Sequence, residues 1–145
     1  MSTQMSMLIK EILLISGLCI MSVEDIRRKE IRRVWLLVLG AAGVLLMVAG
    51  GGLRGIADLA RFIPGMLCLF VAWMTKEQLG WGDAILILVM GCYLDATALM
   101  NVCMIAFAIA GLAALVLLVV VKKSKKYELP LVPFLLTGYV LLCVF

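Results

Sequence analysis

Long apolar runs, separated by short polar breaks, fill almost the whole chain. A helix of about 20 residues crosses the hydrocarbon core of a bilayer, and most of these runs approach that length. The pattern therefore predicts an all-α fold of six membrane-spanning helices. They are expected at about 7–23, 34–49, 55–75, from 82 onward, up to 122, and 129–145.

The polar breaks predict where the chain turns. The run from Ala84 to Val121 is too long for one span, and its polar interruption Asp95-Ala96-Thr97 predicts a turn between the fourth and fifth helices. Gly50-Gly51-Gly52 predicts an external turn after the second helix. Pro64 is expected to bend the third helix, because proline lacks the N–H that a helix interior needs.

The composition places the chain outside the soluble class. Of its 145 residues, 66% are hydrophobic and 15% are charged, and the mean hydropathy is +1.20. Soluble domains have about 45–50% apolar and about 25% charged residues. We therefore expect one integral membrane domain that covers residues 1–145.

The positive charges predict the orientation of this domain. The net charge is +4, and Lys and Arg gather at residues 27–33 and 122–126, with Lys76 in a break between them. Basic loops stay in the cytoplasm, so an even number of spans places both termini on the non-cytoplasmic side. These loops are also expected to bind anionic lipids. Because the clusters lie in short loops, we favour the membrane over nucleic acid as their partner.

The cysteines and the lack of histidine exclude several chemistries. The chain has five cysteines and no histidine. No two cysteines form a CxxC pair, so we expect free thiols and no zinc site. Without histidine, Ser-His and Cys-His nucleophiles are excluded, and carboxylates are the best acid–base candidates. We expect neither a metal nor a cofactor. The cysteines are Cys19, Cys68, Cys92, Cys103 and Cys143.

Two aspartates stand where long apolar runs break off. Asp25 precedes a basic stretch, and Asp83 closes the sequence Gly80-Trp81-Gly82-Asp83. Carboxylates at the membrane edge are costly to desolvate and are functional candidates for that reason. Two carboxylates that share a proton can activate water against a peptide bond. The two glycines would let the backbone bend tightly and admit an extended peptide.

Each aspartate also has a structural explanation when it is taken alone. Asp25 could pair with the arginines after it, and Asp83 could cap the helix that follows. Glu24 is a rival for Asp25, because neighbouring helical positions point about 100° apart and only one of them can face a given partner. The sequence alone does not decide between these two residues.

The other acids inside the apolar segments have a simpler interpretation. Asp58 and Arg61 are three residues apart, so they are expected to form an ion pair on one helix face. Asp95 begins about one helix length from Asp83 and cannot join the same site. We expect it in an external loop.

The order of these features resembles the type IV prepilin peptidases. It runs from Asp25 and its basic stretch, through the Gly80–Asp83 motif, to the late segment that contains Pro133 and Phe134. The closest resemblance is to the short form of tight-adherence pilus systems. It implies that Asp25 and Asp83 are catalytic. It also implies that Gly80, Trp81, Gly82, Pro133 and Phe134 are motif or substrate-binding residues.

This resemblance implies an aspartic endopeptidase in the inner (plasma) membrane of a prokaryote. The enzyme would remove the short basic leader of a prepilin or pseudopilin, after a glycine, at the cytoplasmic face. It would need no metal or cofactor. Larger members add a zinc-binding loop and methylate the new N-terminus with S-adenosylmethionine. This chain has no room for that loop and no paired cysteines, so we expect peptidase activity only.

Three departures from the family pattern leave alternatives open. Arg32 and Arg33 stand where Pro-Asn is usual, Ile85 stands where lysine is usual, and the methylation loop is missing. An inactive homologue is one alternative. A non-enzymatic membrane bundle, either transporter-like or an assembly factor, is another, although a proton relay needs its acids near mid-bilayer. Presenilin-like enzymes share the glycine–aspartate motif, but they are longer and carry a Pro-Ala-Leu segment that the late part of this chain lacks.

Overall fold

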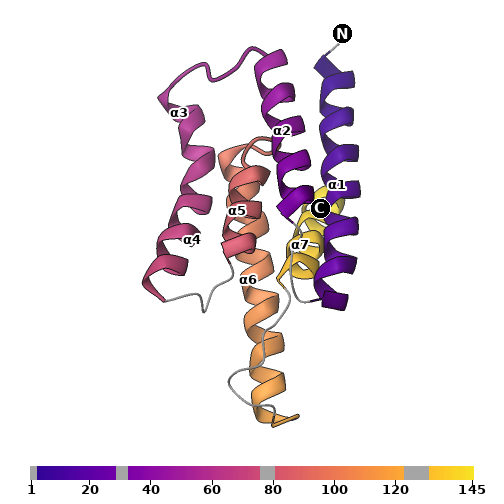
Figure 1. The fold of residues 1–145 in the computed structure, drawn as a ribbon, viewed down its shortest axis with the longest axis vertical. Coiled ribbons are helices and arrows are strands. Elements are labelled where there is room, and N and C mark those ends of the chain that lie inside the picture. Colours follow the sequence, from indigo (N-terminus) through magenta and orange to yellow (C-terminus); the bar gives the residue numbers. More distant parts are fainter. Residues whose placement is uncertain (1–2, 29–32, 76–80, 123–130) are drawn as a thin grey trace.

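A computed structural model describes residues 3–28, 33–75, 81–122 and 131–145, and all of the regular structure in these ranges is helical. The predicted all-α fold is confirmed for these ranges. Figure 1 shows the elements in order. They are α1 (Thr3–Arg28), α2 (Arg33–Ala49), α3 (Ile56–Leu59), the 3₁₀ turn η1 (Ala60–Phe62), α4 (Ile63–Met74), α5 (Trp81–Met90), α6 (Ala96–Val119) and α7 (Val132–Val144).

Three segments are long and apolar enough to cross a membrane: Gln4–Arg28, Ile56–Met74 and Ala96–Val119. The apolar helices α2, α5 and α7 are shorter. The ten residues of α5 reach only about 15 Å, half of a hydrocarbon core about 30 Å thick. The chain is thus a helical protein of the multi-pass membrane type. The six predicted helices are present, and within the described ranges three of them have the full spanning length.

The glycine turn and the proline follow the predicted pattern in part. Gly51 and Gly52 have φ values of +103° and +67°, which glycine adopts without strain, and they form the predicted turn after α2. The third helix is interrupted at η1, directly before Pro64 at the start of α4.

Two boundaries differ from the predicted ones. Helix α1 continues to Arg28 instead of ending near Val23, because Arg27 and Arg28 are favourable in a last turn, where the helix dipole is negative. The turn between α5 and α6 begins at Gly91, earlier than the predicted position. A Cβ atom at Gly91 would lie 2.9 Å from the Arg61 carbonyl oxygen, so close packing against η1 sets this turn.

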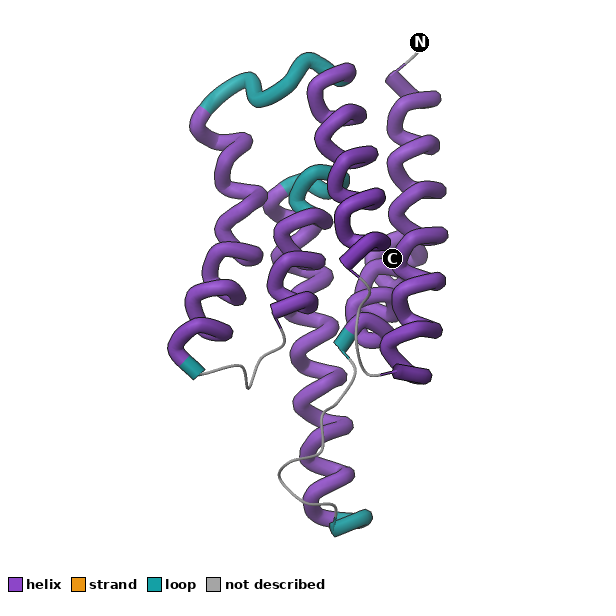
Figure 2. Tube along the Cα trace, in the orientation of Figure 1, coloured by secondary structure: helices purple, strands orange, loops and turns teal. Residues whose placement is uncertain are grey.

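The helices pack side by side into one bundle. Helix α7 packs against α6 and α1, α5 packs against α4 and α2, and α1 packs against α2. Figures 1 and 2 show that α1 ends, and α5 and α7 begin, toward the same end of the bundle. The connection from α2 to α3, which contains the glycine turn, lies toward the opposite end. The second half of α6 projects beyond the other helices.

Close helix contacts fix the positions of α5 and α7. A Cβ at Gly65 of α4 would lie 2.7 Å from the Leu88 Cα of α5, and a Cβ at Gly138 of α7 would lie 2.9 Å from the Val102 carbonyl oxygen of α6. Small residues allow helix backbones to approach closely in membranes. The core between the helices is apolar. Its fully buried side chains include Leu14, Leu18, Leu86, Ile87, Leu99 and Leu135.

Candidate active site

Asp25 lies in the last turns of α1, and its side chain is turned into the bundle. Only 5% of the residue is exposed. The Val132 N–H, at the first residue of α7, donates to Asp25 Oδ2 at 3.3 Å. The first and last helices therefore meet at this carboxylate. Asp25 belongs to the helix itself, since α1 continues to Arg28.

Asp83 lies in the first turn of α5, which begins at Trp81. It is therefore part of the helix, and the alternative in which it caps that helix is wrong. Its Oδ1 atom is buried and has no hydrogen-bond partner among the residues that the structure describes. A buried polar atom without a partner is costly in a protein interior. Such an atom at a helix start needs a proton, a water molecule or a substrate group.

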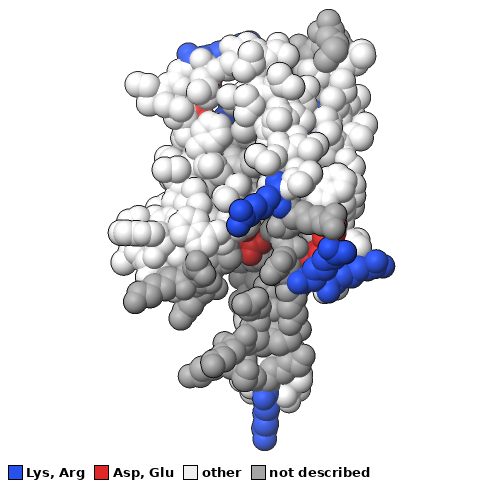
Figure 3. All heavy atoms as spheres, in the orientation of Figure 1, with Lys and Arg blue, Asp and Glu red and all other residues white. Residues whose placement is uncertain are grey.

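The two carboxylates act on each other electrostatically. They come from helices far apart in the sequence, and the charge of Asp25 is felt at Asp83. Helix α2 packs against both α1 and α5 and so couples the positions of the two aspartates. On the face drawn in Figure 3, acidic atoms appear over the start of α5 and the end of α1, with basic atoms beside them, and a smaller acidic area lies near the opposite end.

Neither aspartate has a cation partner in the described ranges. The ion pairs found there both involve Arg61, at the other end of the bundle. Arg27 and Arg28 are exposed and form no ion pair with Asp25. Lys29 and Arg32 lie outside the described residues. The alternative in which Asp25 is solvated and paired with the arginines after it is therefore not observed for Arg27 or Arg28.

The motif residues lie at the same end of the bundle. Trp81 opens α5 and is 42% exposed, and Gly82 is partly buried. Pro133 and Phe134 are partly buried in the first turn of α7, next to the residue that donates to Asp25. Gly80 lies outside the described residues.

A model of the type IV leader peptidase family matches residues 12–119, which is well over half of the chain. The chain belongs to the type IV leader peptidase family. Comparison with curated proteins gave no match, and neither did comparison with solved structures. The match includes Asp25 and Asp83 and ends before α7, so Pro133 and Phe134 lie beyond it.

Membership of the type IV leader peptidase family implies an aspartic peptidase that acts on prepilins. It confirms the predicted resemblance at the level of the family. The narrower expectations, namely the short tight-adherence form and the roles of individual residues, stay predictions.

Glu24 adds a third carboxylate to this end of the bundle. Its Oε2 atom is buried and has no hydrogen-bond partner within the described part of the chain. Adjacent helical positions point about 100° apart, and only Asp25 receives the N–H of α7. This bond distinguishes the two residues in a way that the sequence could not.

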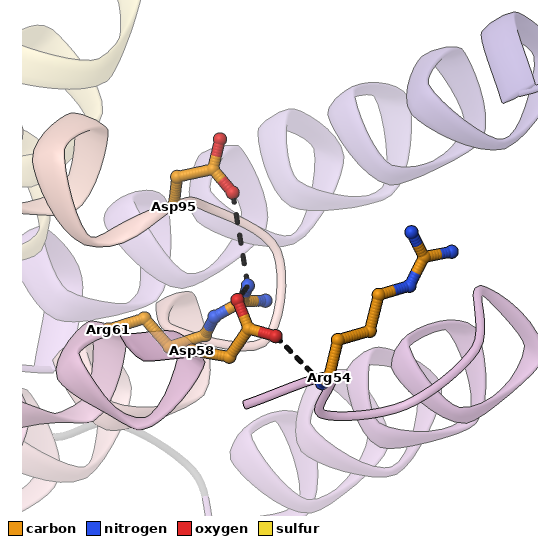
Figure 4. Close-up of polar contacts among 4 residues, drawn as sticks. All are labelled: Arg54, Asp58, Arg61 and Asp95. Carbon is orange, nitrogen blue, oxygen red and sulfur yellow. Dashed lines mark hydrogen bonds and ion pairs between the residues drawn. The ribbon is translucent and has the colours of Figure 1, made fainter. Parts of the chain in front are cut away.

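A second polar cluster lies toward the other end of the bundle (Figure 4). Arg61 Nη2 lies 3.3 Å from Asp58 Oδ1 and 3.9 Å from Asp95 Oδ1. The Arg54 backbone N–H donates to Asp58 Oδ2 at 2.8 Å. The predicted pair of Asp58 and Arg61 is confirmed. The pair of Arg61 and Asp95 was missed, because no local spacing signals a contact between η1 and the start of α6.

The described residues hold no group of three or more His, Cys, Asp and Glu side chains that could bind a metal ion. The five cysteines are free thiols.

Proposed function

We propose that this chain is an intramembrane aspartic endopeptidase that removes the short basic leader of prepilin-like proteins. Cleavage takes place after a glycine, at the cytoplasmic face of the plasma membrane of a prokaryote. Asp25 and Asp83 form the catalytic pair. The observation that carries this proposal is the family match over 12–119, which includes both aspartates. It is supported by their burial in helices that both pack against α2.

The chemistry requires one proton shared between two acids. Two carboxylates in one site do not both ionise readily, so one retains a proton while the other takes a proton from water. The water oxygen bonds to the carbonyl carbon of the scissile peptide. The C–N bond then breaks, and the amine leaves with a proton from the pair. The two groups titrate as a unit, so the pair and not either residue defines the pH dependence.

The substrate must present an extended segment to this pair. A helical prepilin has to unwind locally before its amide can be attacked, and a glycine at the cut lowers the cost of unwinding. Gly80 and Gly82 allow close approach of the peptide, and Trp81, Pro133 and Phe134 line its path. The basic loops bind anionic lipids and hold this end of the enzyme at the membrane surface.

The family departures affect the substrate more than the chemistry. Arg33 opens α2 and is exposed, and Ile85 is 39% exposed on α5. Neither replaces a carboxylate. We assign peptidase activity alone to this chain, with no methyltransferase activity.

The test is cleavage of a prepilin in liposomes by the purified protein. Mass spectrometry of the products should show a new N-terminus directly after the leader glycine. Asp25→Asn and Asp83→Asn should each abolish this product while the circular dichroism of the helices is retained. A chelator should leave the rate unchanged. Cleavage by either variant at the wild-type rate would refute the catalytic pair.

A further inference from the structure

Helix α7 makes the one hydrogen bond that reaches a carboxylate of the proposed pair within the described ranges. The Val132 N–H donates to Asp25 Oδ2 at 3.3 Å. Val132 is fully buried and Asp25 is 5% exposed, so water does not compete freely for this bond. Helix α7 lies beyond residues 12–119, so the family match gives it no role.

The geometry of a helix start explains why this N–H is available. The first N–H groups of a helix have no partner within it, and α7 begins at Val132. The next residue, Pro133, has no N–H at all. The N–H of Phe134 is occupied, because it donates to the Leu131 carbonyl at 3.0 Å. Val132 is therefore the donor of the first turn that is directed at α1.

Asp83 differs from Asp25 in this respect. Its buried Oδ1 receives no hydrogen bond from the described residues. A carboxylate that accepts an N–H bond is stabilised in its ionised form, whereas a buried carboxylate oxygen without a donor favours the protonated form. The positive end of the α7 dipole acts in the same direction on Asp25.

We infer that the first turn of α7 is a positioning element that holds Asp25 as the ionised member of the pair. Asp25 then takes the proton from the attacking water, and Asp83 carries the shared proton toward the substrate. This inference rests on the proposed function and assigns a division of labour within the same site.

The charged groups of the helices packed against α1 are few. Helix α7 carries no charged side chain, and α2 carries Arg33 alone, which forms no ion pair in the described ranges. On α1 itself the charged neighbours are Glu24 and the exposed Arg27 and Arg28, and neither arginine forms an ion pair in the described ranges. Asp83 acts from α5. The Val132 N–H is thus the favourable partner that these elements provide to Asp25.

The first experiment compares Val132→Pro with Val132→Ala in the prepilin assay. Proline is tolerated at the first helical position; it removes the N–H and replaces the valine side chain. Alanine keeps the N–H and also loses most of the valine side chain, so it is the control for the change in side chain. We expect Val132→Pro to lower kcat by about tenfold relative to Val132→Ala, with little change in KM. The acidic limb of its rate–pH profile should move to higher pH by about one unit.

Proline at position 132 disfavours the helical conformation of Leu131 before it, so Val132→Pro could fail to fold. A second measurement therefore uses proteins without this substitution. In protein labelled with ¹⁵N-valine, the Val132 amide is assigned by its disappearance in Val132→Ala. Its proton shift should change with pH in the wild type, as Asp25 titrates. The change should disappear in Asp25→Asn.

The outcomes separate this inference from the proposed function. If Asp25→Asn and Asp83→Asn both lose activity, but the Val132 amide shift is independent of pH, the positioning role is refuted alone. If Val132→Pro folds and its rate–pH profile is the same as that of Val132→Ala, the positioning role is also refuted. Retained cleavage by the aspartate variants would refute the proposed function whatever the amide shows.

Discussion

The two ends of the bundle differ in the partners that they provide to aspartate side chains. At one end, Asp58 and Asp95 lie around the guanidinium of Arg61. At the other end, Asp25 and Asp83 have no cation partner among the described residues, and Asp83 Oδ1 accepts no hydrogen bond from them. Buried charges are normally paired, so an acid pair without a cation indicates chemistry more strongly than an aspartate in an apolar chain does.

The comparison also shows why position in the sequence is a poor guide to role. Asp58 and Arg61 are three residues apart and neutralise each other on one helix face. Asp25 and Asp83 lie on helices that are distant in the sequence, and α2 packs against both of these helices. The first arrangement is local and stabilises the fold, whereas the second needs the complete bundle.

Among changes that leave both aspartates in place, the largest effect is expected when the end that holds Asp25 and Asp83 is given a cation of its own. Ser22 lies three residues before Asp25 and is 6% exposed, so Ser22→Lys reproduces the spacing of the Asp58–Arg61 pair. An adjacent positive charge weakens Asp25 as a base, and we expect prepilin cleavage to fall by about tenfold or more. Ser22→Met, with a chain of similar length and no charge, is the control. A rate for Ser22→Lys equal to that of Ser22→Met would contradict the claim that the missing cation matters.

The next effect is expected when the other end loses its cation. Arg61→Met leaves Asp58 without its partner, and we expect a loss of stability of about 1–3 kcal/mol. Thermal unfolding in detergent measures this loss. At temperatures well below the unfolding midpoint, kcat/KM for prepilin cleavage should stay close to that of the wild type. Asp95 is 89% exposed in its side chain, so Asp95→Asn should change stability by less than about 1 kcal/mol. A large loss of kcat in folded Arg61→Met would show that the two ends do not have separate roles.

The smallest effect is expected at Glu24, which lies at the same end as Asp25 but receives no N–H from α7. Glu24→Gln keeps the shape of the side chain and removes its charge. We expect its rate to fall by less than about tenfold, against about 10²–10⁴-fold for a residue that transfers protons. Initial rates of prepilin cleavage measure the difference. If Glu24→Gln is inactive and Asp25→Asn is active, Glu24 takes the place of Asp25 in the pair.

Much of the fold could be predicted from the lengths of the apolar runs. The runs gave the number and order of the helices, and Gly51 and Gly52 marked a turn that the structure contains. The helix ends were less predictable. Helix α1 extends past Asp25 because charged residues are compatible with a last turn. Helix α5 ends at Met90, and Gly91 directly after it packs closely against the Arg61 carbonyl of η1.

The site could be predicted only in its chemical identity. The glycine motif and the two acids pointed to Asp25 and Asp83, and the family match includes both. No local pattern could reveal that the Val132 N–H reaches Asp25 or that Asp95 pairs with Arg61. Both contacts join segments distant in the sequence, and tertiary packing alone sets them.

The measurement that tests the central claim most directly is a double-mutant comparison of prepilin cleavage. Rates are measured in liposomes for the wild type, Asp25→Asn, Asp83→Asn and the combined variant, each with its helical content checked. Groups that work as one unit are strongly non-additive. We predict that each single variant loses about 10²–10⁴-fold and that the combined variant loses no more than the worse of the two. Losses that multiply, or a single variant that cleaves at the wild-type rate, would contradict a shared catalytic pair.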